Sequence, residues 1–183
     1  MHKITKEFGL DYGHRVWSQK LNPTFSIDDC LVCRHLHGHR MALFIELEAE
    51  KLEAGMVTDF KHLNWFKEWL DIFIDHKFII DINDPAFERI TGRTVDQVNF
   101  RPSLPGIDWA NLGHFILDGS QDEITQIENE ITESFVVVEF VPTSENLAKW
   151  FFEIVTQKMV ELNVKVSKVT MSETPKSQAV YYA

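Results

Sequence analysis

The sequence predicts an α+β fold in a single domain over residues 1–183. Two observations carry this prediction. Segments in which apolar and polar residues alternate lie near both ends of the chain, and this alternation is typical of half-buried strands. Two longer segments between them place apolar residues at helical spacing. The resulting order is strand, strand, helix, a region of unclear structure, helix, strand and strand.

The first two strands are expected near the N-terminus. Residues 3–16 alternate roughly between apolar and polar side chains, and residues 35–50 do so more regularly. The second segment places four apolar residues on one face, namely Met41, Leu43, Ile45 and Leu47. Residues 17–30 between the strands are polar and contain Pro23, which predicts a loop.

The two helices are expected over residues 58–74 and 141–162. The first carries an apolar stripe, made of Phe60, Leu63, Phe66, Leu70 and Phe73. Thr58 or Asp59 can cap its N-terminus, and Thr143 or Ser144 can cap the second helix.

Two further strands close the chain, over residues 164–174 and 178–182. The alternation of the first slips at Ser167 and Lys168, which predicts a β-bulge. Residues 81–141 show no clear periodicity. They contain an acidic stretch and the strand-like "FVVVEF".

Composition and charge limit the possible partners. The 183 residues carry a formal net charge of −10, which argues against a nucleic-acid-binding surface because phosphate contacts need clustered Lys and Arg. The opening residues lack an apolar core of signal-peptide length, and no apolar run is long enough to span a membrane. We therefore expect a cytoplasmic protein that binds no membrane and keeps its two cysteines as thiols.

The segment "CRHLHGHR", residues 33–40, concentrates residues that bind metals. In a strand, His37 and His39 point to the same face, and His35 shares it by parity. His14 ends the first predicted strand and could lie beside them in a hairpin. Three histidines with an open fourth position are typical of a catalytic zinc site.

Three other interpretations remain open from the residues alone. Cys30 and Cys33 with two histidines could form a closed structural Zn²⁺ site, in which no chemistry follows. The same two cysteines could form a redox pair, although the neighbouring histidines would then be unexplained. Each histidine by itself could be an ordinary surface or packing residue.

Several separated motifs occur in one order and together resemble the 6-pyruvoyl-tetrahydropterin synthase / 6-carboxy-tetrahydropterin synthase family. They are "HR" at residues 14–15, "CRHLHGH" at 33–39, "GMVTDF" at 55–60, "IDHKF" at 74–78, "PTSENLAKW" at 142–150 and "SET" at 172–174. The resemblance covers roughly residues 4–80 and 141–182. It leaves the middle of the chain uncovered.

The resemblance implies a tunnelling fold, or T-fold, which is a four-stranded antiparallel sheet with two helices on one face. Residues 81–141 would be an insertion before the second helix, because compact members of the family connect the corresponding motifs by a short loop. Family members form trimeric barrels that stack into hexamers with active sites between subunits. We therefore expect a homo-hexamer, a dimer of trimers.

The resemblance also assigns roles to particular residues. His14, His37 and His39 match the family's Zn²⁺ ligands, which makes His35 a bystander. Cys33, four residues before the first histidine of "HGH", matches the catalytic base. Cys30 matches no family role.

A catalytic relay and a pterin pocket complete the implied site. Asp75 and His76 match the pair that relays protons with the cysteine. Glu173 matches the acid that anchors the pterin ring, where a carboxylate can accept two parallel hydrogen bonds. Three residues match the segment that lines the pterin pocket, namely Thr143, Ser144 and Glu145.

The implied activity is that of a zinc-dependent 6-carboxy-5,6,7,8-tetrahydropterin synthase on the route to queuosine. Such an enzyme converts 7,8-dihydroneopterin triphosphate to 6-carboxytetrahydropterin, acetaldehyde and triphosphate. We favour it because the spacing of Cys33 before "HGH" is similar to that of the bacterial enzymes. A 6-pyruvoyl-tetrahydropterin synthase, which eliminates triphosphate, and a non-catalytic pterin- or zinc-binding protein are the alternatives. Four cations near the site in sequence could bind the triphosphate, namely Arg15, Arg34, Arg40 and Lys77.

Overall fold

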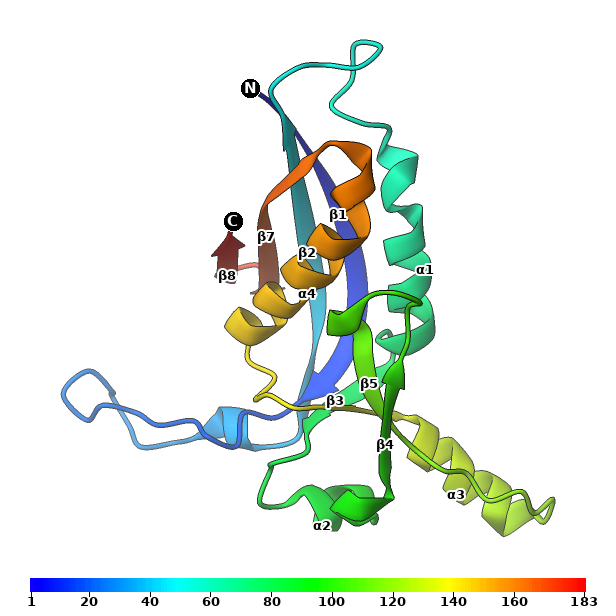
Figure 1. The fold of residues 1–183 in the computed structure, drawn as a ribbon. Coiled ribbons are helices and arrows are strands. Elements are labelled where there is room, and N and C mark those ends of the chain that lie inside the picture. Colours follow the sequence, from blue (N-terminus) through cyan, green and yellow to red (C-terminus); the bar gives the residue numbers. More distant parts are fainter.

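A computed structural model describes all of residues 1–183, and one continuous β-sheet runs through it (Figure 1). The strands are β1 (His2–His14), β2 (His37–Ala49), β3 (Lys77–Asp81), β4 (Val98–Pro102), β5 (Asn111–Phe115), β6 (Phe135–Val138), β7 (Lys165–Thr174) and β8 (Ser177–Tyr182). The α-helices are α1 (Asn64–Phe73), α2 (Phe87–Thr91), α3 (Glu123–Glu133) and α4 (Ser144–Met159). None of these helices has the length and apolar composition needed to cross a bilayer. The α+β class is as the sequence predicts.

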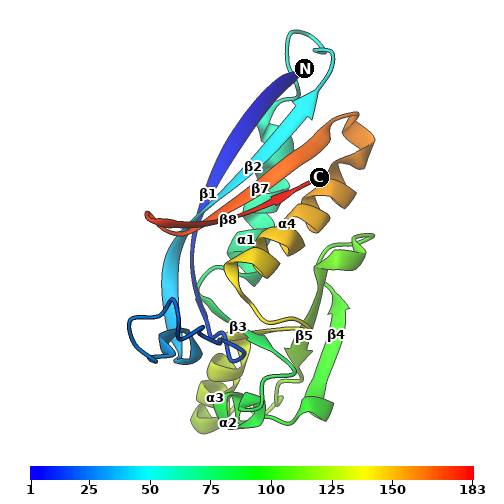
Figure 2. The ribbon, with the colours of Figure 1, turned by 90° about the vertical axis from the view of Figure 1, so that its left-hand side faces the viewer.

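The long half of the sheet consists of β1, β2, β7 and β8, which pair antiparallel in that order. β1 and β2 pair along their whole length, from His2 opposite Ala49 to His14 opposite His37. Helices α1 and α4 lie together on one side of these four strands (Figure 2). This half has the strand and helix arrangement expected from the sequence.

The predicted four-stranded antiparallel sheet is wrong as a description of the whole molecule, because the sheet has eight strands and is mixed. Its order is β4-β5-β6-β3-β1-β2-β7-β8. The short half begins at β3, which runs parallel to β1 where Tyr12 pairs with Lys77. β6 pairs parallel with β3. β5 then pairs antiparallel with β6, and β4 pairs antiparallel with β5. Residues 81–141 therefore extend the sheet.

The core lies between the sheet and the two long helices. It is a cluster of 30 buried residues, in which Leu43, Ile45 and Leu47 of β2 have no exposed surface. Burying one such side chain contributes ~1.5–3 kcal/mol to the free energy of folding. A second cluster of four buried residues, including Ile80 and Phe87, packs β3, β5 and β6 against α2. The main cluster also includes Ile79, Leu112, Val136 and Val138, so the short half of the sheet contributes to both clusters.

Local signals in the sequence are realised at the ends of the helices and in β7. The Asp59 carboxylate accepts a hydrogen bond from the backbone N–H of Lys61, at the start of the 3-10 turn that precedes α1. Thr143 caps α4 by accepting from the N–H of Asn146. The pairing of β2 with β7 skips Ser167, which confirms the predicted bulge.

Candidate metal centre and active site

The hairpin of β1 and β2 brings the three predicted metal ligands together. His14 pairs directly with His37, and Tyr12 pairs with His39, so all four side chains point to one face of the sheet. One ligand atom from each of the three histidines lies within 4.8 Å of the other two. A Cβ on Gly38 would lie 2.7 Å from the carbonyl oxygen of Tyr12, so glycine is what lets the strands approach between the histidines.

Two backbone carbonyls fix the orientation of two of the rings. His14 Nδ1 lies 2.6 Å from the carbonyl oxygen of Pro142, and His37 Nδ1 lies 2.8 Å from that of His35. A carbonyl only accepts, so each Nδ1 donates and each neutral ring keeps its lone pair on Nε2. Metal-binding histidines are commonly held in this way by a partner on the second ring nitrogen.

Burial keeps His14 neutral. Its side chain is 1% exposed, and Nε2 has no hydrogen-bond partner. Burial is the main cause that lowers the pKa of His14 to about 4, and His37 lowers it further. Burial also lowers the pKa of His39. An unpartnered, buried and neutral Nε2 facing two other imidazoles fits a divalent metal ion, for which neutral histidine is a common ligand.

Glu173 and Tyr12 lie against this cluster. Glu173 Oε1 lies 3.4 Å from Nε2 of both His14 and His39. Tyr12 is buried, and its hydroxyl has no hydrogen-bond partner. Burial, with the nearby Glu173 carboxylate, raises the pKa of Tyr12. Tyr12 is not among the site residues predicted from the sequence, although its two-residue spacing from His14 indicates a shared face.

Asp75 and His76 form a turn immediately after α1. Asp75 Oδ1 accepts a hydrogen bond of 2.8 Å from the N–H of Asp11, and Oδ2 lies 2.9 Å from His76 Nδ1. Burial acts to raise the pKa of Asp75, but these two hydrogen bonds, together with Coulombic interactions with His76 and Lys67, lower it overall. His76 adopts a left-handed backbone with φ of 59°, and its N–H donates to the carbonyl of Asp11. The pair is therefore tied to β1 while the imidazole stays exposed.

Cys33 is half-buried in a single 3-10 turn, Val32–Arg34. Its N–H donates to Gln19 Oε1 at 3.0 Å, and its carbonyl accepts from Val16. Within one chain no hydrogen bond joins Cys33 to Asp75 or His76. Neither Cys33 nor the exposed Cys30 belongs to the cluster of metal-binding side chains, so the geometry does not support the closed Cys2His2 site.

The segment that begins α4 reaches the histidines through its backbone. The Pro142 carbonyl that holds His14 immediately precedes Thr143, whose side chain caps the helix. Ser144 and Glu145 form no hydrogen bond with the histidines.

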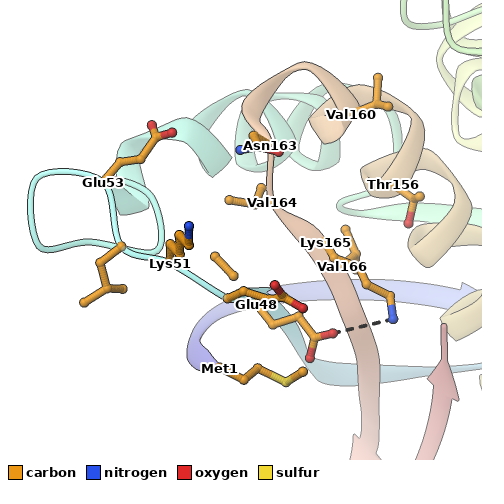
Figure 3. Close-up of a pocket in the computed structure, with 13 residues that line it drawn as sticks. Met1, Glu48, Lys51, Glu53, Thr156, Val160, Asn163, Val164, Lys165 and Val166 are labelled. Atoms are coloured by element: carbon orange, nitrogen blue, oxygen red, sulfur yellow. Dashed lines mark ion pairs between the residues drawn. The ribbon is translucent and has the colours of Figure 1, made fainter.

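Two cavities lie at opposite ends of the long strands. One, of about 630 Å³, is lined by His37, His39, His76 and Lys77 among others. The larger one, of about 880 Å³, lies where β2 ends and β7 begins, beside the end of α4 (Figure 3). Its lining contains neither cysteine nor histidine, and an ion pair of 3.5 Å joins two of its lining residues, Lys165 and Glu48. The cavity beside the histidines is therefore the candidate active site.

Comparison with known proteins agrees with this geometry. The sequence pattern of the family described as 6-pyruvoyl tetrahydropterin synthase matches residues 3–183. The chain belongs to that family. It is 31% identical to a 6-carboxy-5,6,7,8-tetrahydropterin synthase of Aquifex aeolicus, over 98% of this chain and 96% of the relative. The predicted family resemblance is thereby confirmed.

Two solved structures resemble this chain to different degrees. An uncharacterized protein from Wolinella succinogenes superposes with a TM-score of 0.88 at 46% identity, covering 99% of this chain and 97% of that one. The 6-pyruvoyl tetrahydropterin synthase of Caenorhabditis elegans superposes with a TM-score of 0.54 at 22% identity, covering 100% and 95%. The second likeness shows the fold alone.

Four cations lie near the candidate active site in sequence, and three of them have a hydrogen-bond or ion-pair partner in the structure. Arg15 Nε lies 3.1 Å from Asp84 Oδ2, and Arg34 donates to the carbonyl of Gln19. Lys77 Nζ donates to the carbonyl of Glu133 at 2.8 Å. Arg40 is exposed and forms no ion pair or side-chain hydrogen bond.

Proposed function

We propose that the protein is a zinc-dependent 6-carboxy-5,6,7,8-tetrahydropterin synthase acting on 7,8-dihydroneopterin triphosphate. The observation that carries the proposal is the cluster of His14, His37 and His39 with two lone pairs oriented by backbone carbonyls. The near full-length likeness to the Aquifex relative supports the choice of activity.

The chain's own residues supply binding and proton transfer in this proposal. The three histidines hold Zn²⁺, which when bound would act as a Lewis acid toward the hydroxyls of the substrate side chain. Cys33 Sγ, as the thiolate, takes a proton from that side chain, because only the thiolate is a competent base. His76, oriented by the Asp75 carboxylate, accepts and returns protons at its exposed Nε2.

The pterin ring would be anchored by Glu173 of β7. Glu173 would accept two parallel hydrogen bonds from a ring N–H and the exocyclic amine, as a carboxylate can. Thr143, Ser144 and Glu145 would line the ring's pocket from the start of α4. Glu173 contacts both His14 and His39, so this assignment puts the ring beside the metal centre.

A homo-hexamer would complete the site. β3 pairs with β1 only at Tyr12 and Gly13, and the backbone of Asp11 is bonded to Asp75 and His76, so residues 2–10 of β1 leave an open edge, as does β8 at one end of the sheet. Open edges invite pairing with other chains. Cys33 has no contact with Asp75 or His76 within one chain, and a neighbouring subunit could supply the missing partner. Light scattering that shows a monomer would contradict this assembly.

The test is incubation of the zinc-loaded protein with 7,8-dihydroneopterin triphosphate, with products identified by mass spectrometry. We expect 6-carboxytetrahydropterin, acetaldehyde and triphosphate. A 6-pyruvoyl product would instead support the activity named in the family description. Absence of turnover in a zinc-loaded, assembled protein would support a non-catalytic pterin- or zinc-binding role.

A further inference from the structure

A third cavity, formed largely by residues 81–141, is lined by cationic side chains outside the histidine cluster. Its volume is about 330 Å³, at the small end of the ~300–1,000 Å³ range of ligand pockets. Its lining residues come from the C-terminal end of α1, from β3, β4, β5 and β6, and from the end of α3. Its lining residues are Ile72, Phe73, Lys77, Arg101, His114, Phe115, Leu117, Thr132, Glu133, Phe135 and Val136.

The sheet register places the basic side chains of this cavity on one face. Arg101 of β4 pairs directly with Leu112 of β5, and Leu112 belongs to the main core beneath the long helices. His114 follows Leu112 by two residues and so points the same way. The ring of Phe73, at the end of α1, lies 6.4 Å from the His114 ring and forms the opposite wall.

Arg101 has no partner that neutralises its charge. Its side chain forms no ion pair and no hydrogen bond, and it is exposed at the mouth of the cavity. Lys77 Nζ donates one hydrogen bond to the backbone carbonyl of Glu133. No carboxylate therefore neutralises the positive charge of Lys77. The Glu133 side chain is exposed and forms no ion pair with either cation.

The charge of this cavity stands out in an acidic chain. Its lining has one lysine and one arginine against one glutamate, whereas the cavity of Figure 3 has two lysines against three glutamates. Burial lowers the pKa of His114, and Arg101 and Lys77 lower it further, so both cations act on the imidazole. A neutral imidazole still offers one N–H donor.

We propose that the pocket of Lys77, Arg101 and His114 binds a phosphate-type oxyanion. Lys77 supplies a point charge, and Arg101 a planar donor suited to bidentate contact with phosphate. The phenylalanines limit water on one side and strengthen these interactions. Lys77 also lines the cavity beside the histidines, so the two cavities adjoin.

Two sources of the oxyanion share this chemistry. One is the phosphate tail of the pterin substrate, reaching past Lys77, and this alternative rests on the proposed function. The other is a separate phosphate-bearing small molecule that binds independently of turnover. Both require the same cations.

The test is isothermal titration calorimetry of the full-length, zinc-loaded protein with inorganic phosphate as the probe. We expect Arg101→Gln to weaken binding about tenfold or more, as loss of a charged hydrogen bond does, and Arg101→Lys to restore part of it. Arg89→Gln is the matched control, because Arg89 is exposed on α2 and forms no ion pair or side-chain hydrogen bond. Arg101 is itself exposed and unpaired, so its variants should fold.

Equal binding by wild type and Arg101→Gln, or no binding by wild type at millimolar phosphate, would overturn the proposal. Steady-state kinetics of the same variants then separate the two sources. A raised KM with unchanged kcat in Arg101→Gln indicates the substrate tail, whereas unchanged kinetics with weakened phosphate binding indicates a separate ligand. Calorimetry needs no turnover, so failure of the proposed enzyme activity would be seen separately.

Discussion

The long and short halves of the sheet differ in the length over which their strands pair. In the long half, β1 and β2 pair over 13 residues, and one face of each is buried over part of this length, from Phe8 onward in β1 and from Met41 to Leu47 in β2. In the short half the strands have four or five residues each, and a single pairing, Gly113 with Val137, joins β5 to β6. The candidate metal centre therefore lies in the half whose strands pair over a long stretch, and the half with short pairing is attached to it.

The largest expected effect tests whether the long half holds the chemistry. His37→Ala removes one Nε2 ligand and should abolish bound zinc and lower activity by about 10³-fold or more, ~4 kcal/mol in the barrier. Zinc content by plasma mass spectrometry and turnover would be measured together. His35→Ala is the control, because it keeps the carbonyl that holds His37 and removes only an exposed ring. Full zinc in His37→Ala would disprove the assignment.

Cys33→Ala should lower turnover by about 10²–10⁴-fold, the usual contribution of a general base, while zinc content stays unchanged. Cys30→Ala should leave both unchanged, because Cys30 is exposed and outside the metal cluster. Loss of zinc in both variants would instead revive a closed cysteine-histidine site. Unchanged turnover in Cys33→Ala would remove the base from the proposed mechanism.

Asp84→Asn tests how firmly the short half is attached to the loop that follows β1. The Asp84 side chain is fully buried against Arg15, which is 19% exposed. Leaving that arginine unpaired should cost roughly 2–4 kcal/mol of unfolding free energy. For 183 residues this is about 5–12 °C in Tm. Differential scanning calorimetry would measure it, with the exposed Asp96→Asn as control; equal Tm values would show that the ion pair contributes nothing.

The smallest effect lies within the long half and depends on pH. Burial acts to raise the pKa of Glu46, but hydrogen bonds from Lys3 and Ser167, with Lys168, lower it to about 2. A lowered pKa stabilises the folded state above the unfolded pKa, near 4.5, and the gain is lost as pH falls toward about 2.

Glu46→Gln should therefore lower Tm by about 2–4 °C at pH 7, which corresponds to ~1 kcal/mol. The gap from wild type should narrow steadily between pH 4.5 and pH 3. Thermal unfolding followed by circular dichroism would measure it, with the exposed Glu50→Gln as control. A gap independent of pH would mean that packing, not charge, is what the substitution removes.

The same contrast explains what the sequence could predict. Period-two burial in β2 and the cap at Thr143 are local signals, and both elements form where they were expected. Of the four short strands, β6 lies in the segment "FVVVEF", which the sequence marks as strand-like. The other three, β3, β4 and β5, are too short to show a period, and Pro102 and Gly113 interrupt two of them. Their pairing depends on contacts between residues far apart in the chain, which no local pattern reports.

The candidate site also combines contacts that a local pattern predicts with contacts that it does not. Parity and hairpin logic place His14 opposite His37, and the structure brings them together. The carbonyl of Pro142 against His14, more than a hundred residues away, has no signature in the sequence. Nor does the approach of Glu173 to His39, which depends on the β2–β7 pairing and its bulge.

The two flanks of residues 81–141 are fastened to the same short stretch of β1. Asp75 is bonded to the backbone of Asp11 before this segment begins, and Pro142 holds the ring of His14 just after it ends. The chain between them leaves and returns within four residues of one strand. Closing a longer or shorter loop between fixed ends changes the free energy only slowly with its length. Segments of different length and structure can therefore be connected at this stretch of β1 while the three imidazoles keep their positions.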